Sequence, residues 1–144
     1  FTLRGKGFDA TTMIADPDTI RAKIKAIKED PNATGADGDA LTSLELVLEM
    51  NMRGFRFLPA DLYKSHVSRF LMEDEKSLRV PFTSLGGLGE SVAENIVRER
   101  EKAPFLSVED LKDRAKVPSS ILDLLRAHGS LAGMPETSQV SMFF

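Results

Sequence analysis

Apolar and charged residues alternate with helical spacing near the start of the chain. Over residues 18–29, isoleucines recur every three or four positions with lysines between them, which predicts an amphipathic helix with the apolar face Ile20, Ile24 and Ile27. Asp16 or Asp18 can cap its first turn. Residues 1–13 have no such period, so we expect short extended or irregular structure there.

A longer apolar stripe predicts a second helix over residues 41–54. Its members are Leu41, Leu44, Val47, Leu48 and Met52. Gly54 is a suitable stop, because glycine readily adopts the left-handed conformation that ends many helices. Residues 30–40, between the two helices, are rich in Gly, Asp, Asn and Pro, and we expect a flexible loop there.

The pattern becomes strand-like after residue 58. Phe70 to Met72 and Leu78 to Val80 are short apolar runs on either side of an acidic turn, which predicts a small β-hairpin. Three further helices follow. The first runs to about Lys102, the second starts after the N-cap Ser107, and the third lies between Pro118 and Gly129. Asp110, three residues after Ser107, would complete a capping box in which Asp replaces Glu. The expected fold is therefore mainly α.

A cluster of glycines precedes the first of these three helices. Glycine costs roughly 1 kcal/mol relative to alanine inside a helix, so the segment S-L-G-G-L-G at residues 84–89 implies a backbone requirement. Leu88 is expected to point inward as a peg, while Gly87 and Gly89 allow positive φ and leave their amides bare. The buried face of the next helix would be Val92, Ala93, Ile96 and Val97. This is the layout of a helix-hairpin-helix module.

Bare amides at such a hairpin, together with the first amides of the next helix, form a site that suits a DNA phosphate without any base being read. The candidate DNA-binding residues are Leu85, Gly86, Gly87, Leu88, Gly89, Ser91, Arg98 and Lys102. The alternative is a plain tight turn between packed helices. Glu90 would repel a phosphate unless it turns away or caps the helix.

A degenerate second copy follows in residues 107–129, where K-V-P-S stands in place of the glycine hairpin. Lys116 and the amides at Ser119 and Ser120 could meet a phosphate. Because the glycines are missing, we favour a structural role in which this copy completes the core.

The composition narrows the possible functions. The 144 residues carry a net charge of −3, without the global basic field of a strong nonspecific polyanion binder, so any DNA binding should be weak and salt-sensitive. The absence of cysteine excludes disulfides and thiolate metal sites. No apolar run approaches the roughly 20 residues of a membrane span. With no initiator Met and no signal-peptide layout, we expect a fragment of a longer cytoplasmic protein.

The segment Q-V-S-M-F-F at residues 139–144 has the form of a short linear binding motif. Gln139 would make hydrogen bonds at a pocket rim, and Met142 and Phe143, followed by Phe144, would fill an apolar pocket. The alternative is a tail that folds onto its own domain. The pattern resembles the bacterial sliding-clamp motif Q-x-x-L-F, with a methionine that should be tolerated in place of leucine.

The hairpin and the tail together point to a family. The chain resembles the C-terminal end of PolC-type DNA polymerase III alpha subunits, the replicative polymerases of low-GC Gram-positive bacteria. The resemblance covers nearly the whole chain and rests on the segments SLELVLEMNMRGFRF, DLYKSHVSRFLME, PFTSLGGLGESVAENIVREREKAPFLSVEDL, ILDLLRAHGSL and QVSMFF in that order. One departure is Gly86, which stands where the hairpin usually has proline and would loosen the turn.

The resemblance implies three regions. Residues 1–58 would end the fingers region, residues 59–133 would be a tandem helix-hairpin-helix domain that grips duplex DNA, and residues 134–144 would be a flexible tail that docks on the sliding clamp. The implied enzyme is a DNA-directed DNA polymerase (a nucleotidyltransferase, EC 2.7.7.7). Its implied partners are primer-template DNA, the sliding clamp and the remainder of the polymerase, with no membrane.

Catalytic chemistry is not expected in this fragment. Polymerization needs acidic residues that hold two metal ions, so magnesium is expected for the full-length polymerase. The D-x-D pair Asp37 and Asp39 falls in the expected loop, and we expect neither a catalytic residue, a metal site nor a cofactor here. His66 and His128 are isolated, and His128 near a helix C-terminus would suit the helix dipole.

Two other functions remain open. The chain could be the helix-hairpin-helix module of another DNA repair or processing enzyme, such as a glycosylase, for which Asp110 or Lys112 would be a candidate if it faced a base-sized pocket. It could also be a pure protein-interaction module in which the glycine hairpin is only a turn.

Overall fold

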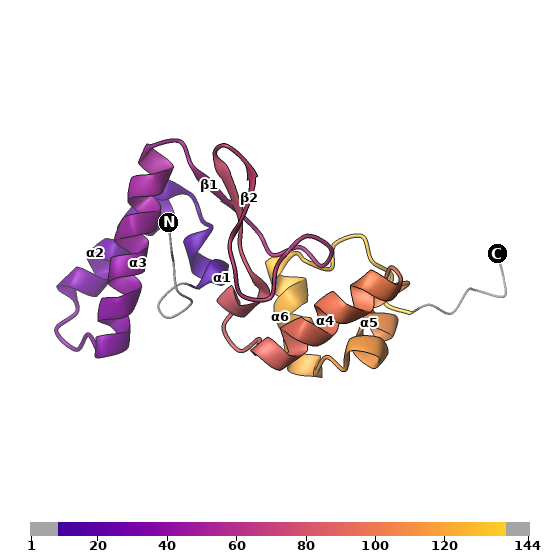
Figure 1. The fold of residues 1–144 in the computed structure, drawn as a ribbon. Coiled ribbons are helices and arrows are strands. Elements are labelled where there is room, and N and C mark those ends of the chain that lie inside the picture. Colours follow the sequence, from indigo (N-terminus) through magenta and orange to yellow (C-terminus); the bar gives the residue numbers. More distant parts are fainter. Residues whose placement is uncertain (1–8, 138–144) are drawn as a thin grey trace.

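The computed structural model describes residues 9–137, with helices at both ends and a small sheet between them (Figure 1). One end contains α1 (Ala10–Met13), α2 (Pro17–Glu29) and α3 (Gly35–Met52). The strands are β1 (Arg56–Leu58), β2 (Leu71–Asp74) and β3 (Ser77–Arg79), and the other end contains the 3-10 turn η1 (Phe82–Ser84), α4 (Glu90–Lys102), α5 (Val108–Ala115) and α6 (Ser119–His128). The expectation of a mainly α fold is confirmed. Within residues 9–137, no helix combines the length and hydrophobicity that a membrane span requires.

The α2 helix forms where the isoleucine pattern predicts it. The Asp16 side chain accepts a hydrogen bond from the Thr19 backbone N–H at 2.9 Å and caps the helix, and Pro17 occupies its first turn. Ile20 is fully buried, while Ile24 and Ile27 are partly buried against the same core. The apolar face of α2 packs against α3.

The expected loop over residues 30–40 is wrong in its second half, because α3 begins at Gly35. Thr34 and Asp37 form a full capping box: Thr34 Oγ1 accepts from the Asp37 N–H at 3.2 Å, and Asp37 Oδ2 accepts from the Thr34 N–H at 2.8 Å. This reciprocal cap outweighs the poor helix propensity of the two glycines in the first turns. Asp37 and Asp39 therefore lie on a helix.

Two more details at this end differ from expectation. The four residues of α1 are helical rather than extended, and Ala10 and Met13 are buried. Met52 is 66% exposed and does not belong to the apolar stripe; its sulfur lies 3.1 Å from Arg21 Nη2. Gly54 has φ +88° and ends α3 as predicted.

The predicted β-hairpin is confirmed, and a third strand joins it. β2 and β3 pair antiparallel, and β1 pairs parallel with β3, which gives the strand order β1-β3-β2. With only three residues, β1 is too short to show strand alternation in the sequence. Its buried Phe57 packs edge-on against Phe70, with ring centroids 5.9 Å apart. β1 ends at the predicted boundary at residue 58 and pairs with β3 beyond it, so the sheet extends over both sides of that boundary. The division into regions stays a prediction.

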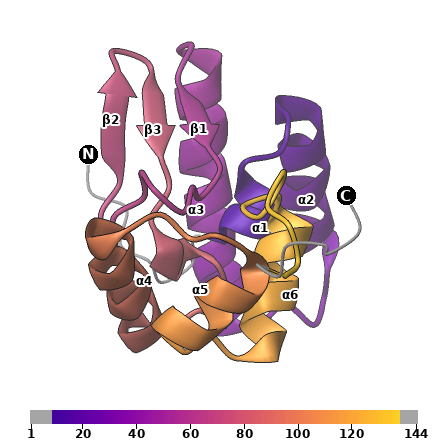
Figure 2. The same ribbon diagram turned by 90° about the vertical axis from the view of Figure 1, so that its right-hand side faces the viewer.

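The loop after β1 ties the sheet to the helices α4 and α6. His128 Nε2 accepts a hydrogen bond from the Ala60 N–H at 2.9 Å, and Ser130 Oγ donates to the Ala60 carbonyl at 2.7 Å. Arg100 of α4 donates to the carbonyls of Leu62 and Ser65 at 2.9 and 2.8 Å. Figure 2 shows α4, α5 and α6 grouped side by side below the strands.

The position of His128 near a helix C-terminus predicted a cation that complements the helix dipole. The structure shows a neutral ring instead. Its Nε2 carries a lone pair that accepts from Ala60, so the ring is neutral, and burial lowers its pKa from 6.5. His66 is held in the same way. Its Nδ1 accepts from the backbone N–H groups of Ser68 and Arg69, and burial, with smaller effects from the charges of Arg69 and Arg100, lowers its pKa.

The two helical hairpins are joined through Arg114. This α5 side chain donates to the carbonyls of Glu99 and Ala103 at 2.7 and 3.0 Å, and of Pro104 at 3.0 Å, which are groups at the end of α4. Its guanidinium lies 4.7 Å from the centroid of the Phe105 ring. A planar side chain with several donors is suited to this task, because the last carbonyls of a helix lack intrahelical partners.

The start of α5 is capped nearly as predicted. Ser107 Oγ accepts from the Asp110 N–H at 3.0 Å. The Asp110 carboxylate, however, accepts from the N–H of Leu106 at 3.0 Å rather than from that of Ser107, and it also pairs with Arg114 at 3.2 Å. Asp110 thus binds the residue before the N-cap, unlike Asp37, which completes the capping box of α3.

Neutral histidines make the stability depend on pH. A ring whose pKa is lowered by folding binds its proton more readily in the unfolded chain. The stability that its neutral form provides is therefore complete above about pH 6.5 and is lost as the pH falls below it. We predict that the free energy of unfolding, measured with urea, decreases between about pH 7.5 and 5.5. The decrease should be smaller in His128→Gln, whose amide oxygen can accept from Ala60 without titrating. A free energy that stays level or rises would contradict the neutral rings.

Removal of Arg114 should destabilise the chain strongly. We predict that Arg114→Ala lowers the free energy of unfolding by about 2–3 kcal/mol, because several carbonyls lose a charged donor at once. Arg53→Ala is a matched control. Arg53 pairs with Glu49 at 2.8 Å on the exposed surface of α3, and its loss should cost no more than about 0.5 kcal/mol. Equal effects of the two substitutions in urea unfolding would show that Arg114 has no special role.

Candidate nucleic-acid interface

The glycine segment forms a tight turn between η1 and α4. The Leu88 N–H donates to the Leu85 carbonyl at 3.0 Å, so Gly86 and Gly87 occupy the two central positions of a four-residue turn. Gly87 has φ +93°, the conformation that the second central position of a type II turn requires. A side chain at this position would be strained, which explains the glycine.

The turn buries its leucines and exposes its glycines. Leu85 and Leu88 are 0% and 3% exposed, so the predicted inward peg is confirmed. Gly86, Gly87 and Gly89 lie on the surface, and a Cβ atom at any of them would meet no atom within 4 Å. The expected positive φ at Gly89 is wrong, because Gly89 has φ −78° and serves as the N-cap of α4. Its missing side chain leaves the helix start open.

The backbone amides around this turn are available for a ligand. Among the described residues, the N–H groups of Gly86, Gly87, Gly89, Glu90 and Ser91 have no hydrogen-bond acceptor, and no side chain caps α4. The first bond of the helix is from the Ala93 N–H to the Gly89 carbonyl at 3.1 Å. The exposed Glu90 does not cap the helix either. Unpaired amides at the positive end of a helix favour an anion.

The two candidate cations on α4 lie farther along the helix. Arg98 is exposed and donates to Asn95 Oδ1 at 2.7 Å, and Lys102 donates to the mostly buried Glu99 carboxylate at 2.8 Å. That hydrogen bond, with the nearby charges of Arg114 and Arg98, lowers the pKa of Glu99. At 1.5 Å per residue, Lys102 is about 20 Å from Gly89, so a phosphate at the turn is out of its reach.

The second copy repeats the backbone of the first. Lys116 has φ 54° and ψ 48°, Val117 is 2% exposed and Pro118 is the N-cap of α6 with φ −61° and ψ 152°. These three residues correspond in order to Gly87, Leu88 and Gly89. The correspondence includes a left-handed residue, a buried peg and an extended N-cap, although the two sequences share no residue.

Lys116 is the single non-glycine residue with positive φ within residues 9–137. Such a conformation costs an L-residue roughly 1–2 kcal/mol, and the flanking helices impose it here. The N–H groups of Ser119 and Ser120 have no acceptor in the described part of the chain, and both residues are exposed. The second hairpin therefore presents unpaired amides at a helix start, as the first does, and its expected packing role stays a prediction.

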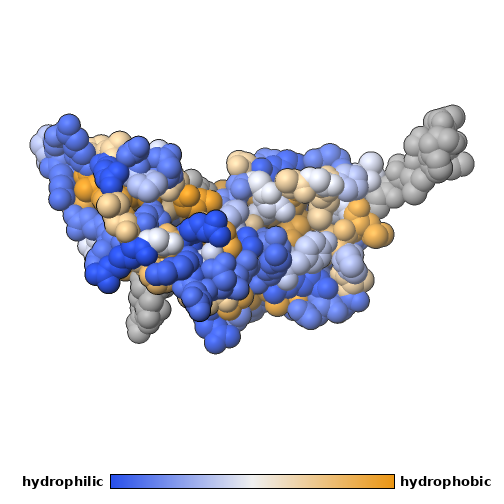
Figure 3. All heavy atoms as spheres, turned by 90° about the horizontal axis from the view of Figure 1, so that it is seen from above, coloured by the Kyte–Doolittle hydropathy of each residue, from blue (hydrophilic) through white to orange (hydrophobic). Residues whose placement is uncertain are grey.

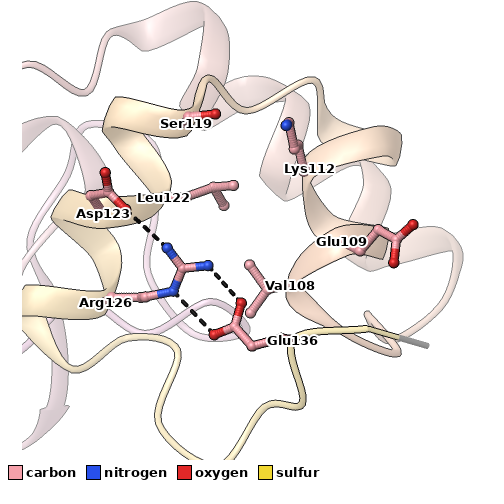
Figure 4. A pocket seen from close by; sticks show the side chains of 8 residues that line it. All are labelled: Val108, Glu109, Lys112, Ser119, Leu122, Asp123, Arg126 and Glu136. Carbon is pink, nitrogen blue, oxygen red and sulfur yellow. Dashed lines mark hydrogen bonds and ion pairs between the residues drawn. The ribbon is translucent and has the colours of Figure 1, made fainter. Parts of the chain in front are cut away.

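The two alternative glycosylase candidates line separate hollows. Lys112 lines a hollow of about 420 Å³ between α5 and α6, where Arg126 is held by Asp123 and Glu136 (Figure 4). Asp110 lines a different hollow, and its carboxylate accepts hydrogen bonds from the Leu106 N–H and from the Arg114 guanidinium. The described residues likewise place no three acidic or histidine side chains where they could hold a metal ion.

The predicted clamp-motif residues Gln139, Met142, Phe143 and Phe144 lie outside the described residues. The segment just before them is docked. The Pro135 carbonyl accepts from the Val108 N–H at 2.9 Å, and the Glu136 carbonyl accepts from the Glu109 N–H at 3.0 Å. The Glu136 carboxylate also pairs with Arg126 at 2.6 Å (Figure 4). The described part of the chain thus ends beside the N-terminus of α5.

Comparison with known proteins agrees with this geometry. The family model described as helix-hairpin-helix motif matches residues 54–140. The chain is 42% identical over 143 residues to the DNA polymerase III PolC-type of Thermotoga maritima, and 45% identical over 148 residues to that of Bacillus subtilis. Each alignment covers 99% of this chain and 10% of the relative, so the chain spans about a tenth of the length of these curated relatives. The chain belongs to the helix-hairpin-helix motif family and is homologous, along nearly its whole length, to a fragment of PolC-type DNA polymerase III.

Proposed function

We propose that this chain binds the phosphate backbone of primer-template duplex DNA through its two hairpins, as part of a replicative DNA-directed DNA polymerase. The observation that carries the proposal is the set of unpaired amides between Gly86 and Ser91, at the open start of α4. The names of the relatives support the polymerase context.

Backbone amides are suited to binding that ignores sequence. A phosphate between Gly87 and the first turn of α4 would accept hydrogen bonds from N–H groups, and the absence of side chains at Gly86, Gly87 and Gly89 would let the DNA backbone approach closely. Contacts to phosphates do not depend on the base sequence. Binding of this kind therefore suits a polymerase, which must hold DNA of every sequence that it copies.

The second hairpin offers a second phosphate site of the same construction. Lys116 adds a positive charge that the glycine hairpin lacks, next to the amides of Ser119 and Ser120. In Figures 1 and 2 the starts of α4 and α6 lie on the same lower side of the molecule. Two contacts on one side let a duplex touch both hairpins at once. Since the net charge is −3, few counterions would be released and the affinity of the chain alone should be modest.

The second part of the proposal is that residues 139–144 tether the polymerase to a sliding clamp. Its support is the motif Q-V-S-M-F-F and the docked segment before it, which places the end of the described chain at the domain surface beside α5. A tether raises the effective concentration of the polymerase at the primer end. Magnesium would serve the full-length polymerase, and no step of this proposal passes through a metal on this chain.

Bulky side chains in the glycine turn should abolish duplex binding. We predict that Gly87→Val combined with Gly89→Val weakens binding of a 20-base-pair duplex at low salt at least tenfold, because the side chains block the amides. Fluorescence anisotropy of labelled duplex measures the effect. Gly54→Val is the matched control, since Gly54 has a similar φ of +88° but lies at the end of α3. Its duplex affinity should equal that of the unmodified chain.

The glycine result also separates the rival functions. Unchanged affinity in the double variant would reject the hairpin site, and absence of duplex binding by the unmodified chain at low salt would favour a protein-interaction module. Excision of a damaged base by the chain would favour a glycosylase instead.

The tail makes a separate prediction. Deletion of residues 139–144 should abolish binding to a purified bacterial sliding clamp, measured by surface plasmon resonance, and leave duplex affinity unchanged. The physical reason is that the two sites share no residue. Clamp binding that survives the deletion would contradict the tether.

A further inference from the structure

The loop between α4 and α5 carries an unusual amount of exposed apolar surface. Leu106 is 69% exposed, and Ala103 and Pro104 beside it are also on the surface. Tyr63, 46% exposed, extends this surface, because its ring lies 6.2 Å from that of Phe105 and its hydroxyl accepts from the Phe105 N–H at 3.0 Å. We call Tyr63, Ala103, Pro104 and Leu106 the linker patch.

The linker patch borders a hollow and is rigidly held. The hollow has a volume of about 430 Å³ and is lined by Glu99, Lys102, Ala103, Pro104, Leu106, Asp110 and Arg114. Arg114 binds the carbonyls around it, and Asp110 fixes the Leu106 N–H. Apolar side chains in the centre with charged groups at the edge are the usual composition of a protein-binding surface.

The patch faces away from the proposed DNA sites. The thirteen residues of α4 separate it from the glycine hairpin by about 20 Å. In Figures 1 and 2 the loop from α4 to α5 lies on the upper side of this end, opposite the starts of α4 and α6. A duplex on the hairpins would therefore leave the patch uncovered.

The described part of the chain ends next to the patch. Pro135 is bonded to Val108, and Leu106 is only two residues before Val108, which is at most about 7 Å of chain. Gln139 is three residues after the docked Glu136, at most about 11 Å of chain. Figure 3 shows hydrophobic surface at the same end of the molecule, close to where the described chain ends.

We propose that the linker patch is a second contact for the protein that captures the tail, so that the sliding clamp binds the tail and the linker patch together. This inference rests on the proposed tether. A protein that holds Gln139 is brought within about 20 Å of Leu106 by the short chain between them, and a standard interface is about 30 Å across. The clamp surface beside its tail pocket would cover Leu106 and leave the hairpins free for duplex DNA.

The test compares clamp affinities of four species by surface plasmon resonance: the unmodified chain, Leu106→Glu, Met72→Glu and a synthetic peptide of residues 138–144. Leu106→Glu should weaken binding of a purified bacterial sliding clamp about tenfold, to the level of the peptide alone. Met72→Glu is the matched control, because Met72 is 56% exposed on β2, away from the tail, and its clamp affinity should be unchanged. Both variants should keep their unfolding midpoint and their duplex affinity.

The outcomes separate this inference from the tether itself. If the peptide binds the clamp but Leu106→Glu binds as tightly as the unmodified chain, the tether stands and the linker patch belongs to another partner, such as the rest of the polymerase. If the peptide alone binds as tightly as the chain, the second contact is also rejected. If neither the peptide nor the chain binds the clamp, the tether fails and this inference fails with it.

Discussion

Arg114 is the contact through which the two helical hairpins act as one body. It reaches from α5 to the carbonyl groups at the end of α4, stacks on Phe105 and pairs with Asp110. The Glu99 carbonyl also accepts from the Ala103 N–H at 3.3 Å, and the Ala103 and Pro104 carbonyls lie past the last residue of α4, where one planar side chain can bind several acceptors at once. The contact therefore fixes the angle at which α5 leaves α4. Since α6 follows α5 after a tight turn, the position of the second hairpin depends on this angle.

The proposed DNA-binding surface is made of backbone rather than of side chains. At both hairpins a left-handed residue, a buried apolar peg and an extended N-cap turn the start of a helix toward solvent. The buried side chains of Leu88 and Val117 anchor the turns in the core. A folded core thus holds two sets of amides in position before any ligand arrives, which lowers the entropy cost of binding. The acidic overall composition is compatible with this arrangement, because amides do not contribute to net charge.

Much of this fold was predictable from the sequence, and the failures have identifiable causes. Helical periodicity located α2 and the helices from α4 to α6, and the glycine cluster identified the turn at Gly87, where positive φ is found. The start of α3 was missed because the capping box of Thr34 and Asp37 outweighs two glycines. The strand β1 is too short for a pattern, and Arg114 has no local signal because its partners lie up to 15 residues away. The left-handed position in the second hairpin was not predicted, because a lysine occupies it.

The most direct test of the central claim is an NMR titration of the ¹⁵N-labelled chain with a short duplex at low salt. The account predicts that the largest amide shifts fall on two groups, Gly86 to Ser91 and Lys116 to Ser120, and that the amides of α2 and α3 remain unchanged. Shifts confined to one hairpin would leave the other with a packing role only. Large shifts on α2, with its exposed lysines, and none at the hairpins would contradict the account and move the DNA site to the opposite end of the molecule.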